Sequence, residues 1–193
     1  MRWRELGDQE CSVARTVSVI GDRWTLLVLR ECFLRVRRFE QFQERLGITR
    51  PVLAERLQKL VEAGVLEKVA YQERPLRQEY RLTPRGLDLY PIMMAIVHWG
   101  DVHMAGKKGR PVLHHHLRCN HEFDPMMVCS ECHERLEPRE VRAAPGPGAR
   151  HPQHLPVELA ASLGRRAAMK AADGGEARPK RTAKGKAKTS AVG

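Results

Sequence analysis

The side chains best suited to chemistry gather in one short stretch, "HLRCNHEFDPMMVCSECH", which holds three of the chain's five cysteines. The donor residues, with the spacing H-x2-C-x9-C-x2-C, are His116, Cys119, Cys129 and Cys132. A gap of two residues lets a tight turn direct two side chains at one ion, and four nitrogen or sulfur donors complete a tetrahedron around zinc. The spacing therefore predicts a structural zinc site in a zinc-ribbon-like segment, residues 111–140, with strand residues at Val112–Leu113 and Met126–Val128 around the turns.

Other interpretations of this stretch stay open. His121 and His133 are alternative nitrogen ligands, and the run of three histidines at 114–116 leaves the first ligand position ambiguous. Cys129 and Cys132 could instead form a redox disulfide, although no thioredoxin-like strand and helix surround them. The letters "CSECH" also fit a haem attachment, which requires export and a haem-binding fold that the sequence does not indicate. Four protein ligands would leave zinc no open coordination position, so we expect a structural role and no catalysis.

The overall charge of the chain points to an anionic partner. Its 193 residues carry a net charge of +11, and 42% of them are apolar, which is enough for a core over part of the chain. No run approaches the roughly 18 apolar residues of a membrane span, and the N-terminus lacks the apolar segment of a signal peptide. We therefore expect a cytoplasmic protein with no membrane partner, in which thiols bind metal more readily than they form stable disulfides.

The middle of the chain has the pattern of a winged helix. Apolar residues at helical spacing predict two helices that break at Gly21. The stretch "RRFEQFQERLGITRPVLAERLQKLVEAG" predicts two more helices around a turn at Gly47, which is a helix-turn-helix. Strand-like residues 65–72 and 78–82 predict a hairpin with "ERPLR" at its tip. The predicted fold class is therefore mainly α with a small β-hairpin wing (α+β).

The ends of the chain differ in composition from this middle part. Residues 141–193 are rich in Ala, Gly, Pro and Lys and hold 11 basic residues against 3 acidic ones, which predicts a disordered basic tail. The predicted divisions are an N-terminal arm at 1–10, a winged helix-turn-helix DNA-binding domain at 11–106, the zinc-ribbon-like segment at 111–140 and the tail at 141–193.

A last helix is expected to open at Thr83–Pro84 and to run to about Ala105, with a kink or a restart at Pro91. Its apolar surface is longer than so small a domain needs for its own core. We therefore expect a dimer interface there, because small DNA-binding proteins commonly bind two half-sites as a symmetric pair. The residues of this predicted surface are Leu87, Tyr90, Met94, Val97 and Met104.

The exposed residues of the helix-turn-helix and the hairpin predict how the chain would bind duplex DNA. In this motif the start of the second helix approaches base edges in the major groove, so Arg50 is the candidate to donate to guanine O6 and N7. Arg37 and Arg38 would lie over the backbone, and the hairpin arginines would reach the neighbouring minor groove. The full set of candidate DNA-binding residues is Arg37, Arg38, Thr49, Arg50, Pro51, Gln58, Lys59, Arg74 and Arg77.

The run from "CSVARTVSVIGDRW" to "YRLTPRGLDLYPIMMAIVHWGD" closely resembles the HxlR family of winged-helix transcriptional regulators, which are relatives of the MarR regulators. The resemblance covers roughly Cys11 to His103, as a series of matched segments in fixed order. It implies a homodimer on double-stranded operator DNA, with the N- and C-terminal helices in the interface. It also makes Cys11 a candidate redox sensor, because a cysteine at this place senses oxidants or electrophiles in some members, although "CSV" stands here where "CPV" is usual.

We therefore expect a sequence-specific DNA-binding transcriptional regulator that acts as a homodimer on operator DNA and is not an enzyme. A response to redox or to a small ligand is compatible with this function, but the sequence does not identify the effector. The first alternative is a nonspecific nucleoid-type binder driven by the basic tail. A thiol redox protein is a weaker alternative, because no general base is paired with the cysteines.

Overall fold

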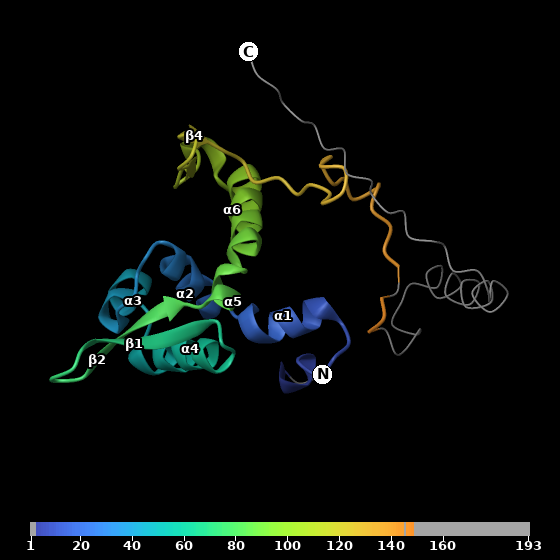
Figure 1. Ribbon diagram of the computed structural model, residues 1–193. Coiled ribbons are helices and arrows are strands. Elements are labelled where there is room, and N and C mark those ends of the chain that lie inside the picture. Colours follow the sequence, from blue (N-terminus) through green and yellow to red (C-terminus); the bar gives the residue numbers. More distant parts are fainter. Residues whose placement is uncertain (1–2, 145, 149–193) are drawn as a thin grey trace, which may run out of the picture. The chain divides into compact units, whose positions relative to one another are not determined.

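The computed structural model describes residues 3–144 and 146–148 of the chain (Figure 1). The described residues up to Val141 form one compact unit. We call these residues the first unit. The predicted disordered tail at 141–193 lies outside the described residues except at its first few positions. The elements of the first unit are η1 (Trp3–Leu6), α1 (Ser12–Ile20), α2 (Arg23–Phe33), α3 (Phe39–Leu46), α4 (Arg50–Glu62), β1 (Leu66–Gln72), β2 (Arg77–Leu82), α5 (Pro84–Leu87), α6 (Tyr90–Met104), η2 (Gly106–Lys108), β3 (His115–His116) and β4 (His121–Glu122).

Local signals explain where the helices begin and end. Asp22 follows the break at Gly21 and caps α2, because its carboxylate accepts hydrogen bonds from the N–H groups of Trp24 and Thr25. Gly47 ends α3 in the left-handed conformation, with φ of 61°, which glycine adopts at no steric cost. The predicted break between α1 and α2 and the predicted turn between α3 and α4 are both confirmed.

One apolar core holds α2, α3, α4 and the base of the hairpin together. The periodic leucines of α4 face inward, and Leu53, Leu57 and Leu60 are completely buried. They meet Phe42 of α3, Leu29 of α2 and the first residues of the hairpin. Burial of this apolar face, rather than helix propensity, fixes how α4 is presented.

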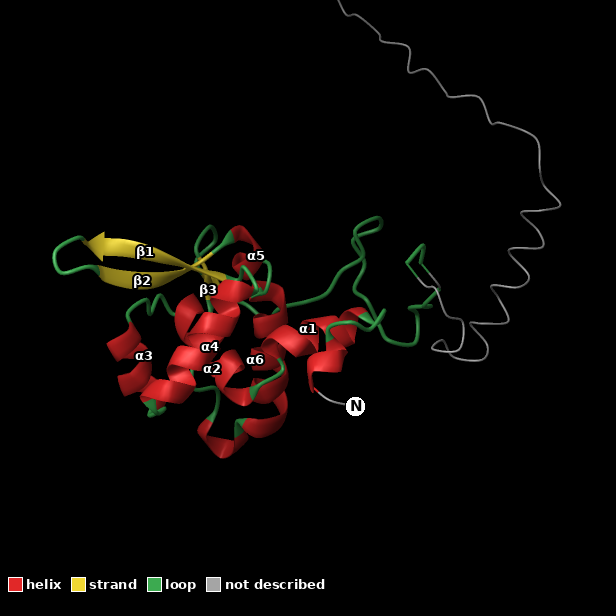
Figure 2. Ribbon diagram, turned by 90° about the horizontal axis from the view of Figure 1, so that it is seen from below, coloured by secondary structure: helices red, strands yellow, loops and turns green. Residues whose placement is uncertain are grey.

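The hairpin is the predicted wing, and it projects from the helical part of the unit (Figure 2). Its strands β1 and β2 pair antiparallel with Leu66 opposite Leu82, and the register shifts between Ala70 and Gln72. At its base, the Thr83 hydroxyl donates to the carbonyl of Gly64 at 2.6 Å and accepts from the N–H of Gly86, where it caps α5. The predicted fold class, helical with a small β-hairpin wing, is confirmed.

The last helix restarts as expected near Pro91: α5 and α6 are separated at Asp88–Leu89, and Pro91 lies in the first turn of α6. Two other regions differ from the sequence-based expectation. The N-terminal arm contains a short 3-10 helix, η1. Val112–Leu113 is not a strand, because the pairing begins at β3, two residues later; of Met126–Val128 only Val128 pairs, with Arg135. None of the helices in residues 3–144 and 146–148 is long and apolar enough to cross a membrane.

A buried carboxylate joins α2 to α3. Glu31 is 1% exposed, and the guanidinium groups of Arg30, at 2.6 Å, and Arg45 both hold it. Burial alone would raise the pKa of Glu31, but the hydrogen bonds and charges of these two arginines outweigh it and hold the pKa below its ordinary value of 4.5. A carboxylate removed from water in this way stabilises the fold only while it is ionised and paired.

We expect Glu31→Gln to lower the free energy of unfolding by about 1–2 kcal/mol at pH 7, because it removes a charged partner of two arginines. Because the pKa of Glu31 is lower in the folded protein than in the unfolded chain, its carboxylate stabilises the fold at any pH above the unfolded-state pKa. This contribution is lost as the pH falls through the folded-state pKa. The difference between variant and wild type should therefore shrink below about pH 4.5. Urea unfolding at pH 7 and at acidic pH measures it, with the exposed Glu44→Gln as the matched control. An equal loss at both pH values would contradict the electrostatic explanation.

Candidate nucleic-acid interface

The N-terminal end of α4 carries the residues predicted to read bases. Thr49 is the N-cap residue, but its side chain makes no capping hydrogen bond. Arg50 and Pro51 form the first turn, and Thr49 and Arg50 are exposed. The guanidinium carbon of Arg50 lies 4.8 Å from the centre of the Phe39 ring. An aromatic ring at the start of α3 therefore orients the arginine that begins α4.

A second arginine connects the start of α3 to the wing. The guanidinium carbon of Arg38 lies 4.6 Å from the centre of the Tyr71 ring on β1. The N–H of Arg38 donates to the Gln41 side chain, which caps the first turn of α3. These two contacts fix Arg38 beside the hairpin, while its charge stays exposed.

The tip of the wing supplies two further cations. Arg74 lies in the loop between the strands, Arg77 begins β2, and both are exposed. Within residues 3–144, no carboxylate pairs with Arg38, Arg50, Arg74 or Arg77. These four arginines can therefore bind DNA without first breaking an ion pair. Within the predicted set, they are the residues best suited to contact phosphates or base edges.

Three other members of the predicted set are already engaged within the unit. Gln58 donates to Glu62 at 3.0 Å and accepts from Lys68 of β1 at 3.1 Å, so it ties α4 to the wing. Lys59 pairs with Glu55 at 2.9 Å along the same helix. Arg37 lies 3.6 Å from the buried carboxylate of Glu79, and its carbonyl accepts the N–H of Tyr80. A role of these three residues in DNA binding stays a prediction. In the structure, their contacts hold α4 and the wing in position.

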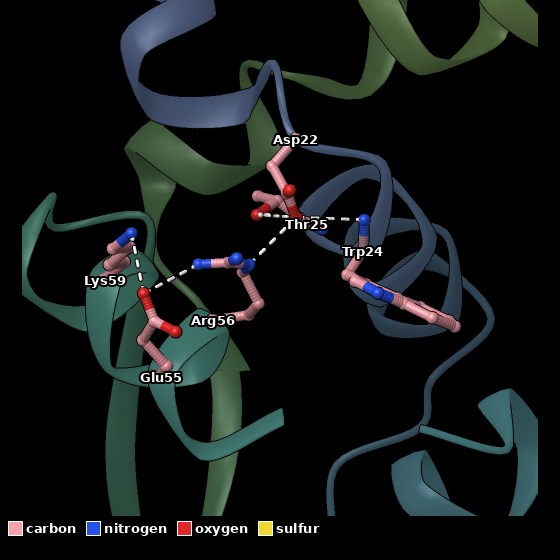
Figure 3. Close-up of polar contacts among 6 residues, drawn as sticks. All are labelled: Asp22, Trp24, Thr25, Glu55, Arg56 and Lys59. Carbon is pink, nitrogen blue, oxygen red and sulfur yellow. Dashed lines mark hydrogen bonds and ion pairs between the residues drawn. The ribbon is translucent and has the colours of Figure 1, made fainter. Parts of the chain in front are cut away.

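A charged network that the sequence did not reveal fixes α4 against α2 (Figure 3). Arg56 reaches Asp22 at 2.8 Å and Glu55 at 2.9 Å, and Glu55 also holds Lys59. The hydrogen bond and charge of Lys59, with the charge of Arg56, lower the pKa of Glu55. Burial would raise the pKa of Asp22, but the N–H of Thr25 and the charge of Arg56 outweigh it. The carboxylate that caps α2 thus also orients the helix that is predicted to enter the groove.

The candidate interface also includes residues that the sequence pattern does not reveal. Phe39 and Tyr71 hold the two arginines, Arg56 sets the position of α4, and Lys68 links α4 to the wing. Only the aromatic character of Phe39 and Tyr71 next to basic stretches could have hinted at the first two contacts. The other two join residues more than nine positions apart, and no local pattern predicts them.

The two cysteines of the N-terminal half differ in their surroundings. Cys11 is exposed at the start of α1, and Arg15 directs its Nε to the carbonyl of Gln9. Cys32 is buried in the core, and burial together with the nearby charge of Glu31 raises the pKa of its thiol to about 12. Cys32 therefore remains a protonated core residue at neutral pH. Redox sensing at Cys11 stays a prediction.

The predicted metal ligands occur as two pairs. His116 Nδ1 lies 3.3 Å from Cys119 Sγ, and His121 is opposite His116 in the β3–β4 pairing. N–H groups of Cys132 and Glu131, and the Cys132 side chain, lower the pKa of Cys129. Within residues 3–144 and 146–148, no three His, Cys, Asp or Glu side chains lie close enough together to hold one ion. The complete four-ligand site stays a prediction.

Comparison with known proteins places this geometry in a family. The HxlR-like helix-turn-helix family matches residues 19–108. The uncharacterised HTH-type transcriptional regulator Rv3095 of Mycobacterium tuberculosis (strain ATCC 25618 / H37Rv) is 44% identical over 137 residues, which are 71% of this chain and 87% of that protein. A match of this length ends at residue 137 or later, so it extends across the cysteine-rich segment.

Similar proteins with lower identity extend the comparison. An uncharacterised HTH-type transcriptional regulator of Methanothermobacter thermautotrophicus is 36% identical over 104 residues, 51% of this chain and 78% of that protein. The crystal structure of PA1607, described as a candidate transcription factor, is 33% identical with a TM-score of 0.65 and covers 71% of this chain and 96% of its own. With the winged helix-turn-helix described above, these matches show that the chain belongs to the HxlR-like helix-turn-helix family of transcriptional regulators.

Proposed function

We propose that this transcriptional regulator binds a specific operator in duplex DNA as a homodimer. The observation that carries the proposal is a set of four exposed arginines, none paired with a carboxylate of the described residues, at the three places where a winged helix contacts DNA. Arg50, at the start of α4, is suited to the major groove, Arg38 to the backbone, and Arg74 and Arg77 of the wing to the neighbouring minor groove. Because aromatic rings hold Arg50 and Arg38, less side-chain freedom is lost when they bind.

An apolar groove between α1 and α6 supports the proposed homodimer. Ile92 and Ile96 of α6 form one side of the groove, and Val13 and Val17 of α1 form the other. Trp99, one turn further along α6, is 60% exposed. A second copy of the chain is the occupant that fits, because symmetric operators require a two-fold pair and one self-complementary patch serves both subunits.

We expect Arg50→Ala to weaken binding to the specific site by about tenfold to 100-fold, because a bidentate contact to guanine is lost. Arg77→Ala should weaken binding to every duplex by a smaller factor and lower the dependence on salt by about one phosphate contact. The measurement is fluorescence anisotropy at several salt concentrations, on an operator selected from a pool of random duplexes. Lys107→Ala is the matched control, because it removes an exposed cation from η2, outside the helix-turn-helix and the wing.

Failure of the selection to enrich any duplex would contradict specific binding. So would equal losses from Arg50→Ala and Lys107→Ala. Either result would favour the nonspecific nucleoid-type binder.

The nonspecific alternative rests on the 11 basic residues among positions 141–193. Deletion of residues 142–193 separates the two functions. A specific regulator should keep its affinity for the selected operator and lose mainly background binding, whereas a binder driven by the tail should lose nearly all affinity.

A further inference from the structure

The first pair of predicted metal ligands lies in a short hairpin. His116 and His121 are paired across β3 and β4, with four residues between them. The N–H of Asn120 donates to the carbonyl of His116 at 2.7 Å, and Asn120 has a left-handed φ of 55°. This turn brings the ring nitrogen Nδ1 of His116 to 3.3 Å from Sγ of Cys119, so the two donors already converge. We call residues 116–121 the first knuckle.

The second pair lies in a hairpin of the same construction. The N–H of Cys129 donates to the carbonyl of Glu134 at 2.9 Å, again with four residues between the paired positions. The N–H of His133 donates to the carbonyl of Cys129 at 2.9 Å, and His133 has a left-handed φ of 62°. A bridge between Val128 and Arg135 continues the pairing. We call residues 129–134 the second knuckle.

The two knuckles are equivalent position by position. Each has a donor at its first position, a cysteine three residues later, and a left-handed residue after that cysteine, whose N–H donates to the carbonyl of the first residue. His116 corresponds to Cys129, whereas His121 corresponds to Glu134, which is not a donor suited to a thiolate-rich zinc site. The equivalence therefore selects His116 over His121, which the spacing alone left ambiguous.

We propose that His116, Cys119, Cys129 and Cys132 bind one zinc ion that closes the two knuckles on each other. Paired knuckles that each present two donors supply the four ligands of a tetrahedral site. Three thiols and one imidazole favour zinc over calcium or magnesium, which prefer oxygen ligands. On binding, the three thiols release their protons to solvent and coordinate as thiolates. Four protein ligands leave no open position, so the ion acts structurally.

The chain between the knuckles permits this closure. Residues 126–127 belong to no helix or strand and lie beyond the contacts with α6, and in residues 3–144 and 146–148 no three suitable donors lie together. Each knuckle is thus formed by its own backbone hydrogen bonds, whereas their approach is left to the ion. Free energy of metal binding then becomes free energy of folding for this segment.

The first knuckle is the fixed half, because it is anchored to α6. Arg110 pairs with Asp124 at 2.7 Å and with Glu122 at 3.5 Å, and Asp124 also faces His98 of α6 at 3.5 Å. Phe123 and Pro125 line a small cavity together with Met94 and Val97 of α6. Zinc would therefore fasten the second knuckle to a segment that already contacts α6.

Metal analysis of the full-length protein, purified without chelator, tests the proposal. We expect one zinc per chain by mass spectrometry, and cobalt substitution should give the visible absorption of a tetrahedral thiolate site. Cys119→Ser, Cys129→Ser and His116→Ala should each lose stoichiometric zinc. The matched controls, His121→Ala for the histidine and Cys11→Ser for the thiols, should each keep one zinc per chain. Far-ultraviolet circular dichroism checks that the winged helix remains folded in every variant.

Closure of the knuckles has a readout of its own. Protease cleavage at residues 126–127 should be slow in the zinc-bound wild type and fast after chelation, whereas both forms retain their helices. These measurements involve no DNA, so their outcome does not depend on whether the protein binds an operator. The proposal is overturned if purified wild-type protein holds no zinc and takes up no cobalt, if His121→Ala loses the metal while His116→Ala keeps it, or if Cys129 and Cys132 are found joined as a disulfide.

Discussion

Replacement of Ile96 by glutamate should convert the protein to a monomer and lower its affinity for operator DNA by about 100-fold or more, which corresponds to about 2.7 kcal/mol. Ile96 is 45% exposed on α6 and lines the apolar groove with Ile92 and with Val17 of α1. In the proposed dimer, the new carboxylate would be removed from water without a partner, which costs several kcal/mol. Two linked half-sites bind far more tightly than one, so the loss of the dimer is passed on to the operator.

Sedimentation or light scattering measures the oligomeric state, and anisotropy measures the affinity, at matched protein concentrations. Val141→Glu is the control, because it places the same charge at an exposed apolar residue near the end of the first unit. A thermal melt checks that the Ile96→Glu monomer is folded, since Ile96 lies at the edge of the helical packing. A folded Ile96→Glu variant that remains dimeric would contradict the assignment of this groove as the interface.

The elements of this fold could be predicted because each has a local cause. Asp22 after Gly21 sets a helix start, Gly47 sets a helix stop, and the leucines at 53, 57 and 60 recur at helical spacing. The strands of the wing are bounded by a proline-containing loop. Caps, turns and periodicity act over a few residues, so a sequence displays them directly.

The face of α6 that is left exposed could not be predicted in the same way. The predicted exposed surface includes Met94, and this prediction is wrong, because Met94 is only 5% exposed and packs inward. The exposed apolar residues include the predicted Leu87, Tyr90 and Met104, together with Ile92, Ile96 and Trp99. Apolar residues surround α6 on both faces, so its periodicity does not select one. The choice depends on how the helix restarts at Tyr90, which is set by packing against the rest of the unit.

Contacts between segments that are far apart in the sequence could not be predicted either, for a related reason. The spacing of the DNA-binding candidates placed their charges on exposed positions, but it did not show that Gln58 is held by Glu62 and Lys68. Nor did it show that Arg56 joins α4 to Asp22. Such pairs follow from the packing of helices and the wing, which no short window of sequence contains. The cysteine spacing predicted the two turns, whereas the equivalence of His116 with Cys129 required the backbone pairing.

A methyl group at Gly86 should destabilise the protein by about 3 kcal/mol, because the space that it would need is occupied by backbone. Gly86 lies in α5, at the base of the wing, and is buried. A Cβ atom built there would lie 2.2 Å from the carbonyl oxygen of Val65 and 3.0 Å from a Leu82 methyl. Its N–H is also held by the Thr83 hydroxyl, so the turn cannot rotate away without losing its cap. Either α5 or the start of the wing must therefore move in Gly86→Ala.

For Gly100→Ala we expect the opposite change in stability. Gly100 lies within α6, and a Cβ atom there meets no heavy atom within 4 Å. Alanine should therefore stabilise the protein by about 0.5–1 kcal/mol, through its better helix propensity and the smaller entropy of the unfolded chain. Urea unfolding of both variants measures the contrast. Val65 directly precedes β1, and Leu82 ends β2. Gly86→Ala should therefore also shift the wing relative to α4 and weaken operator binding at temperatures where the variant is still folded, whereas Gly100→Ala should leave the wing in place. A Gly86→Ala variant as stable as the wild type would show that the backbone at the base of the wing can move to make room for the methyl group. In that case α4 and the wing would not form one rigid DNA-binding surface.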